Sequence, residues 1–73
     1  MSIDVKSEIA GKVWKIEVKP GDMLDEDDPI LILESMKMEI PVPVPFACRV
    51  LDILVAEEDA VAEGQTVARI ERA

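Results

Sequence analysis

The residues with the clearest chemical potential lie in the middle of the chain, where Met36, Lys37 and Met38 stand side by side. Apolar residues typical of a strand precede them and an extended Ile-Pro-Val run follows, so Met36 and Lys37 are predicted to form the centre of a tight hairpin turn. Favoured two-residue hairpin turns need positive φ, which Asn or Gly normally supplies. A methionine and a lysine break this local rule, and such a departure at a turn tip marks a candidate functional residue. We therefore expect the Lys37 amine to project from the tip.

Other chemistry is scarce in this chain. It contains no histidine, which excludes Ser-His and Cys-His nucleophile pairs, and no glycine-rich phosphate loop. The acidic run at residues 25–28 lacks the ligand spacing of a calcium loop, so we interpret it as a solvated turn. An exposed lysine amine is a poor nucleophile at neutral pH, but it can accept an acyl group that another enzyme has activated. We predict no catalytic residue and no metal site.

Size and charge narrow the class of protein further. The 73 residues suffice for one domain with a small core, and the net charge of −8 disfavours nucleic acid and anionic membranes as partners. No segment approaches the roughly 20 apolar residues of a membrane span, and the first residues do not resemble a signal peptide. The single cysteine, Cys48, cannot form an internal disulfide, so we expect a buried apolar role for it and a cytoplasmic setting for the protein.

A repeat of 37 positions organises the chain. Residues 9–34 lie on residues 46–71 without a gap, and seven of the 26 aligned pairs are identical, among them Val13 with Val50 and Asp22 with Asp59. Two copies are too few for a solenoid, so the better interpretation is two half-domains packed face to face about an approximate two-fold axis. The predicted hairpin tip, residues 35–38, lies between the halves. The same symmetry predicts that both termini lie together at the opposite end.

Each half is interpreted as a set of short strands. Trp14, Ile16 and Val18 alternate with charged residues, which is the period of a half-buried strand and predicts Trp14 in the core. Turn residues follow at 20–22 and 25–29, and the apolar run at 30–33 has the length of a buried strand. Prolines at alternate positions predict an edge strand or an extended connector between residues 41 and 45. The predicted fold class is all-β: a flattened sandwich or barrel of two small antiparallel sheets.

The string Glu-Ser-Met-Lys-Met-Glu-Ile-Pro at residues 34–41, set between two matching halves, resembles the attachment motif of the biotinyl domain family. The turn at residues 18–22 resembles the family as well, and the likeness covers about residues 5–71. It implies a barrel-sandwich hybrid without the protruding thumb of longer carriers, because the gapless repeat leaves no room for one. It further implies that a biotin protein ligase attaches biotin covalently to Lys37, with Met36 and Met38 as flanking recognition residues. Glu34 is a candidate docking contact, although its match with Glu71 leaves a structural role equally open.

The function that this resemblance implies is that of a biotin carboxyl carrier. Such a carrier takes CO₂ from a biotin carboxylase site to a carboxyltransferase site and catalyses nothing itself. We expect residues 1–73 to form one such carrier domain, monomeric in isolation, within an acyl-CoA type carboxylase such as the acetyl-CoA carboxylase of fatty acid biosynthesis. Acetyl-CoA, propionyl-CoA and pyruvate all stay open as the final acceptor. The initial methionine favours a free subunit over a fragment of a longer chain.

Two alternatives use the same hairpin differently. Lipoate on Lys37 is the first, although the similar lipoyl domains usually carry Asp-Lys-Ala at the tip, so that Met36 and Met38 favour biotin. The second is an unmodified interaction module, such as the hairpin domain of some membrane-fusion adaptors. The sequence also departs from the family where Gly is usual, at Asp27, Cys48 and Glu58. If those positions require positive φ, the substitutions lower stability.

Overall fold

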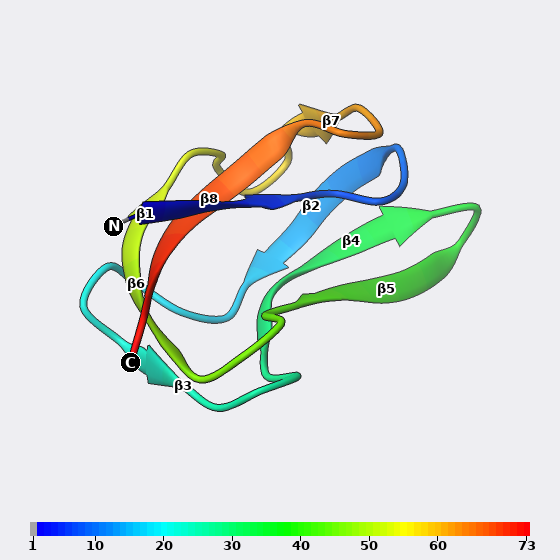
Figure 1. The fold of residues 1–73 in the computed structure, drawn as a ribbon. Helices are drawn as coiled ribbons and strands as arrows, with labels where there is room; N and C mark the ends of the chain where they lie inside the picture. The colour runs from blue at the N-terminus through cyan, green and yellow to red at the C-terminus, as the bar shows by residue number, and fades with distance from the viewer. Residues whose placement is uncertain (1) are drawn as a thin grey trace.

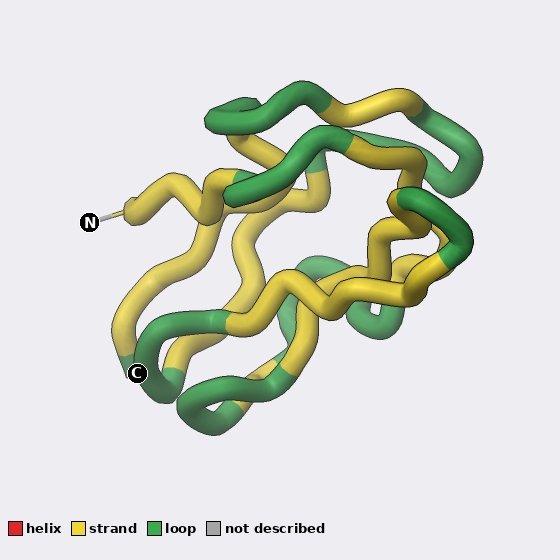
Figure 2. Tube along the Cα trace, turned by 90° about the vertical axis from the view of Figure 1, so that its right-hand side faces the viewer, coloured by secondary structure: helices red, strands yellow, loops and turns green. Residues whose placement is uncertain are grey.

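The computed structural model describes residues 2–73, and in that range the chain forms eight β-strands and no helix (Figures 1 and 2). The strands make two four-stranded antiparallel sheets: sheet A has the order β1-β8-β6-β3, and sheet B has the order β5-β4-β2-β7. The predicted all-β class is thereby confirmed. The strands are β1 (Ser2–Lys6), β2 (Gly11–Ile16), β3 (Met23–Leu24), β4 (Pro29–Ser35), β5 (Met38–Pro43), β6 (Cys48–Ile53), β7 (Ala60–Val61) and β8 (Thr66–Arg72).

Residues 37 positions apart, which we call counterparts, occupy equivalent places in the two sheets. The strands β1, β2, β3 and β4 correspond to β5, β6, β7 and β8, and the pairing of Lys12 with Glu34 recurs as the pairing of Arg49 with Glu71. The correspondence extends upstream of residue 9 to the first strand, where Val5 is the counterpart of Val42. Residues 6–8 share no identity with residues 43–45, which hid this first strand from the sequence comparison.

Counterpart positions also build the core between the sheets. Val13 in β2 and Val50 in β6 are both fully or almost fully buried, and so are Leu33 in β4 and Ile70 in β8. Burying such a side chain contributes about 1.5–3 kcal/mol, and both sheets supply buried side chains to this core. The buried cluster consists of Val5, Val13, Ile30, Leu31, Leu33, Val42, Val44, Cys48, Val61, Val67, Ala68 and Ile70.

The prediction that Trp14 is a core residue is wrong, because 46% of its surface is exposed. The register of β2 against β4 shifts between Val13 and Lys15, so Trp14 is the extra residue of a β-bulge. Because of the bulge, the side chain of Val13 rather than that of Trp14 is buried. Ile16, two residues further on, still packs against the core. Strand β6 carries the counterpart shift between Val50 and Asp52. An insertion of one residue is invisible to a simple count of alternating residues.

The turns of the two halves are closed by the same side-chain contacts. The carboxylate of Asp22 accepts a hydrogen bond from the Lys19 backbone N–H at 3.0 Å, and its counterpart Asp59 accepts one from Ala56 at 2.9 Å. Short polar side chains stabilise turns in this way. This shared contact explains why the aspartate is identical in both halves.

Two of the three replaced glycines lie where glycine is favoured. Asp27 has φ of 71° and Glu58 has φ of 78°, and their counterparts Gly64 and Gly21 also have positive φ. The third position, Cys48, does not need glycine for its backbone angle, because its counterpart Gly11 has no positive φ. At Gly11 the reason for glycine is space, since a Cβ there would lie 2.8 Å from the Glu34 carbonyl oxygen. The expected strain therefore applies to Asp27 and Glu58 only.

Pro41 and Pro43 lie in β5, the edge strand of sheet B, which is one of the two possibilities that the alternating prolines predicted, and Pro45 follows the end of that strand. Strands β4 and β5 make a long hairpin that reaches one end of the molecule, and the start of β1 and the end of β8 lie at the other end (Figure 1). In residues 2–73 no helix is long and apolar enough to cross a membrane. Met1, on which the expectation of a free subunit partly rests, lies outside the described residues.

Candidate functional site

The hairpin tip is a two-residue turn formed by Met36 and Lys37. Ser35 at the end of β4 pairs with Met38 at the start of β5, and the residues between them have φ of 52° and 64°. Positive φ at both central residues is the mark of a type I′ turn, whose twist suits a hairpin. A residue other than glycine with positive φ costs about 1 kcal/mol or more of folding stability. Met36 and Lys37 are therefore unfavourable choices for this turn if stability alone is considered.

The side chains of the tip point into solvent. Met36 is 91% exposed and Met38 is 62% exposed, and Lys37 between them is exposed too. Among residues 2–73 no carboxylate lies within ion-pair distance of the Lys37 amine. The amine is therefore accessible to an incoming acyl group, and the turn fixes the direction in which it projects. The structure thus places Met36, Lys37 and Met38 together, as the sequence predicted.

Glu34 and its counterpart Glu71 prove to have different surroundings. Glu71 accepts a hydrogen bond from the Arg49 guanidinium at 2.6 Å, whereas Lys12, the equivalent cation for Glu34, lies 2.8 Å from Glu58 instead. The hydrogen bond and the charge of Glu58 raise the pKa of Lys12 above its ordinary value. Within the described part of the chain, Glu34 therefore has no cation paired with its carboxylate.

The remaining candidates from the sequence have structural surroundings. Cys48 is fully buried, and burial followed by the nearby charge of Asp28 raises the pKa of its thiol, which keeps it protonated and unreactive. The acidic run lies in a turn in which the Asp28 carboxylate accepts the Asp25 backbone N–H at 3.0 Å. In residues 2–73 no group of three or more acidic or sulfur side chains is arranged to hold a metal ion.

One cavity in the structure could not be predicted from the sequence. A cavity of about 250 Å³ lies between the loop that follows β1 and the edge strand β5, and it begins at Ile40, the third residue after Lys37. Its polar Ser7 hydroxyl already donates to the Ile9 carbonyl. The cavity depends on how two edges pack, which no local pattern of residues reports. Lys6, Glu8 and Asp27 supply the charged part of its lining.

A family of proteins matches nearly the whole chain. The sequence pattern described as "Biotin-requiring enzyme" covers residues 1–70. A biotin/lipoyl attachment protein of Bacillus subtilis is 40% identical over 63 residues, which is 86% of either chain. The homolog of biotinylated protein TB7.3 in Mycobacterium leprae is 39% identical over 70 residues, covering 96% of this chain and 99% of that one.

Solved structures share the fold. The Kluyveromyces lactis urea carboxylase contains a similar domain with a TM-score of 0.90 and 33% identity, which covers 96% of this chain but only 6% of the enzyme. A multi-domain long-chain acyl-CoA carboxylase gives a TM-score of 0.93 at 24% identity, over 7% of its length. The lipoyl domain of the 2-oxoglutarate dehydrogenase complex of Azotobacter vinelandii matches over 97% of this chain, with a TM-score of 0.79 and 23% identity. A lysine-tipped hairpin on this duplicated scaffold, together with a family match over residues 1–70, shows that the chain belongs to the biotin/lipoyl attachment family and is a non-catalytic carrier domain.

Proposed function

We propose that this chain is a biotin carboxyl carrier and that Lys37 is the residue to which biotin is attached. The observation that carries this proposal is the exposed Lys37 amine in a type I′ turn, flanked by two exposed methionines. The family match and the biotinylated relatives support biotin as the cofactor. The lipoyl domain of similar fold makes lipoate on the same amine the second candidate.

The side chain of Lys37 supplies a nucleophile that a ligase must activate and position. In the loading reaction, the deprotonated amine attacks the acyl carbon of an activated biotin ester. A C–N bond forms, the C–O bond to the leaving group breaks, and one amine proton goes to solvent. Because the turn fixes the backbone at Met36 and Lys37, binding to the ligase has mainly the side chain of Lys37 left to order.

Met36 and Met38 suit the role of recognition residues. Both are large, apolar and mostly exposed, so a ligase that covers the tip can bury them at about 25 cal/mol per Å² of apolar surface. Methionine also adapts its shape to a partner surface, because it has three rotatable bonds and a polarisable sulfur. A ligase that requires apolar contact on either side of the lysine distinguishes Lys37 from the other four lysines of the chain.

Once attached, biotin supplies a ring that carries CO₂ as a carboxylate. The chain contributes a β-sheet platform that keeps this arm at the end of the molecule opposite the start of β1 and the end of β8 (Figure 1). Tethering replaces repeated bimolecular delivery by local transfer at high effective concentration between a biotin carboxylase and a carboxyltransferase. For the carboxylase we propose the acyl-CoA type, with acetyl-CoA as the first acceptor to test. The urea carboxylase of similar structure makes urea the second.

Intact mass spectrometry tests the attachment. The wild-type chain and Lys37→Arg are each co-expressed with a biotin protein ligase and, separately, with a lipoate ligase. We expect the mass of one biotin on the wild type, none on Lys37→Arg, and no lipoate on either. Lipoate addition without biotin addition selects the second candidate. Unmodified wild type with both ligases, while a known carrier is labelled in parallel, contradicts both.

A further inference from the structure

The two halves of the chain are interleaved in the fold. The first half holds β1 to β4, and the second half holds β5 to β8. Within residues 2–73, four of the six strand pairings join the two halves: β1 with β8, β2 with β7, β3 with β6 and β4 with β5. The other two, β2 with β4 and β6 with β8, lie within one half. Each half therefore needs the other to complete both sheets.

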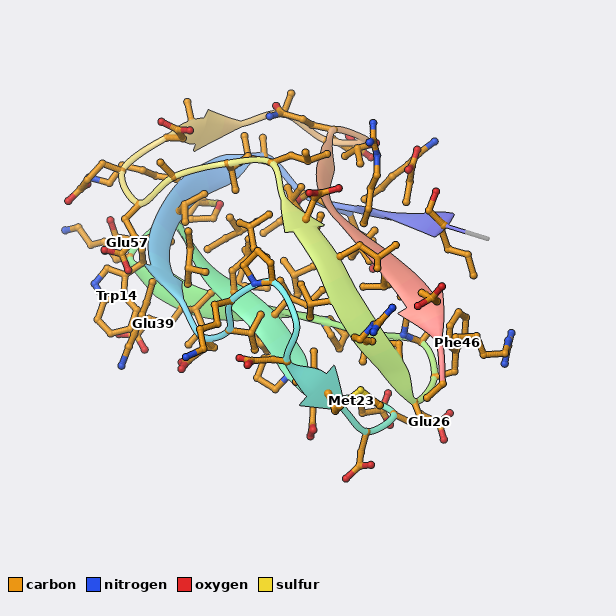
Figure 3. The ribbon with its side chains drawn as sticks, turned by 90° about the vertical axis from the view of Figure 1, so that its left-hand side faces the viewer. Trp14, Met23, Glu26, Glu39, Phe46 and Glu57 are labelled. Atoms are coloured by element: carbon orange, nitrogen blue, oxygen red, sulfur yellow. The ribbon has the colours of Figure 1, made fainter. Side chains whose placement is uncertain are left out.

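Side-chain contacts join the same two halves. The Lys12 amine of the first half lies 2.8 Å from the Glu58 carboxylate of the second. The Glu57 carboxylate accepts a hydrogen bond from the Ile16 N–H at 3.2 Å. Figure 3 shows Glu57 projecting from the same side of the molecule as Trp14, which belongs to the first half. The buried cluster also draws on strands of both halves. None of these contacts requires that the two halves belong to one chain.

The covalent link between the halves is the strained turn at Met36 and Lys37. Their positive φ angles, 52° and 64°, are unfavourable for residues other than glycine. The register that pairs Ser35 with Met38, continued by one residue, places Met36 of one copy opposite the partner's Lys37. Residues 30–40 contain neither glycine nor proline, so this segment can run on as one strand with ordinary φ. Opening the turn therefore relieves strain and extends an existing strand pairing.

We propose that two copies of this chain exchange halves by opening the turn at Met36 and Lys37. In the exchanged dimer the first half of each copy pairs with the second half of its partner, and every contact of the monomer apart from the turn is rebuilt. A short, strained hinge between complementary parts favours such an exchange. The sequence led us to expect a monomer in isolation, and exchange adds a dimer that forms at high chain concentration.

Exchange removes Lys37 from its turn. The dimer consists of two lobes joined where each monomer has its hairpin tip, so it is longer than the 34 Å monomer. Lys37 then lies in the strand between the lobes, opposite the partner's Met36, and no tip is left for a ligase to cover. The exchanged dimer is therefore a form of the carrier that does not accept biotin. This consequence rests on the proposed function, whereas the exchange itself does not.

A cross-link between paired strands tests the exchange. Glu34 and Glu39 are directly paired across β4 and β5, so Glu34→Cys/Glu39→Cys can form a disulfide there. This disulfide lies within one chain in the monomer and links two chains in the exchanged dimer. The variant, with Cys48→Ala added, is refolded from urea at about 10 µM and about 1 mM chain, oxidised, and separated on a non-reducing denaturing gel.

We expect disulfide-linked dimers after refolding at the higher concentration and almost none at the lower. Glu34→Cys alone, in the same Cys48→Ala background, gives the level of random cross-linking. Circular dichroism checks that each variant is folded. Folded protein in which linked dimers stay at the random level at both concentrations overturns the exchange.

Relief of strain tests the hinge. Met36→Gly removes the cost of positive φ from the turn and so favours the closed monomer. Asp27→Gly is the matched control, because Asp27 has φ of 71° at a site that exchange leaves unchanged. After refolding, sedimentation equilibrium should give a dimer Kd about tenfold or more higher for Met36→Gly than for wild type, and within about twofold for Asp27→Gly. Equal shifts for the two variants, or none for Met36→Gly, contradict an exchange through this turn.

Loading of the separated wild-type monomer and dimer distinguishes this inference from the proposed function. Each form is incubated with a biotin protein ligase, and intact mass follows the initial rate. We expect the dimer to incorporate biotin at least about tenfold more slowly than the monomer, because it lacks the form of Lys37 that the ligase binds. Equal rates would show that Lys37 keeps its tip in the dimer and overturn the exchange. A monomer that no ligase labels overturns the proposed function, while the cross-link still decides the exchange.

Discussion

At the scale of single residues, chemistry in this protein is determined by surroundings rather than by residue type. The chain has five lysines, but only Lys37 lies in a turn with positive φ on both central residues and with exposed methionines on either side. Likewise, Glu34 and Glu71 are identical residues at equivalent positions, yet only Glu71 has a cation within ion-pair distance in the described chain. The single thiol, on Cys48, is buried beside Asp28 and unsuited to nucleophilic chemistry.

The flanking methionines give the first prediction. Replacing Met36 or Met38 by alanine should lower kcat/KM for ligase loading about tenfold, because apolar contact next to the amine is lost. Met23→Ala is the matched control, since Met23 is 63% exposed and Met38 is 62% exposed, but Met23 lies in the other sheet. Initial rates of biotin incorporation, followed by intact mass, provide the measurement. Equal rates for all three variants and wild type would show that the ligase does not read the methionines.

Cys48 gives a prediction about pH. Burial raises the pKa of its thiol in the folded chain above the ordinary value of 9.0. As the pH rises past 9, the unfolded chain therefore loses the thiol proton before the folded chain does. The stability that this thiol contributes is therefore complete below pH 9 and is lost as the pH rises further. The free energy of unfolding in urea should fall more steeply from pH 8.5 to 10 for wild type than for Cys48→Ala. Parallel pH profiles for the two proteins would contradict this account.

Several of these residue properties were predictable from the sequence and others were not. Lys37 could be placed at a tip because Met-Lys departs from the usual turn residues, and that departure is visible locally. The exposure of Trp14 could not be foreseen, because one bulge reverses which residues face inward. The difference between Glu34 and Glu71 depends on Lys12 reaching Glu58 in a distant loop, which no spacing along the chain reveals.

At the scale of elements, the sequence specifies strands and edges more clearly than register. The alternating prolines indicate the edge strand β5, and the shared aspartates at positions 22 and 59 indicate equivalent turns. The counterpart bulges in β2 and β6 could not be predicted from the alternation of hydrophobic residues, because each bulge adds one unpaired residue to a strand. The cavity beside β5 is likewise a product of packing between two edges.

The positive-φ turns give a prediction at this scale. Asp27→Gly should raise the free energy of unfolding by up to about 1 kcal/mol, because the relief of backbone strain exceeds the added entropy of the unfolded chain. The reverse change at the counterpart, Gly64→Asp, should lower it by a similar amount. Urea unfolding at neutral pH measures both. Destabilisation by Asp27→Gly would show that the aspartate makes a contact more important than the strain.

At the scale of the whole molecule, duplication produces a scaffold with two distinct ends. The molecule measures 34 × 18 × 17 Å, with the turn between β4 and β5 at one end and the start of β1 and the end of β8 at the other (Figure 1). Counterpart strands make equivalent pairings, and both sheets supply residues to one core. The two outer faces differ in detail: Arg69 lies 3.8 Å from Asp4 on sheet A, where the counterpart positions on sheet B are Ile32 and Pro41.

The separation of tip and core predicts that loading leaves the fold unchanged. Lys37 has no ion-pair partner in residues 2–73 and its side chain is exposed, so removing its charge by acylation should change the free energy of unfolding by less than about 0.5 kcal/mol. Urea unfolding of the unmodified and biotinylated protein, prepared in parallel, measures the difference. A shift of more than about 1 kcal/mol would indicate that the arm packs against the domain.

The central claim is that one amine, at the tip between the two halves, receives biotin. Site-resolved peptide mass spectrometry of the protein loaded by a biotin protein ligase tests it most directly, because the four other lysines serve as internal controls. The account predicts biotin on Lys37 and on none of Lys6, Lys12, Lys15 and Lys19. Biotin on one of those four lysines, or an unlabelled chain in a reaction that loads a known carrier, would contradict it.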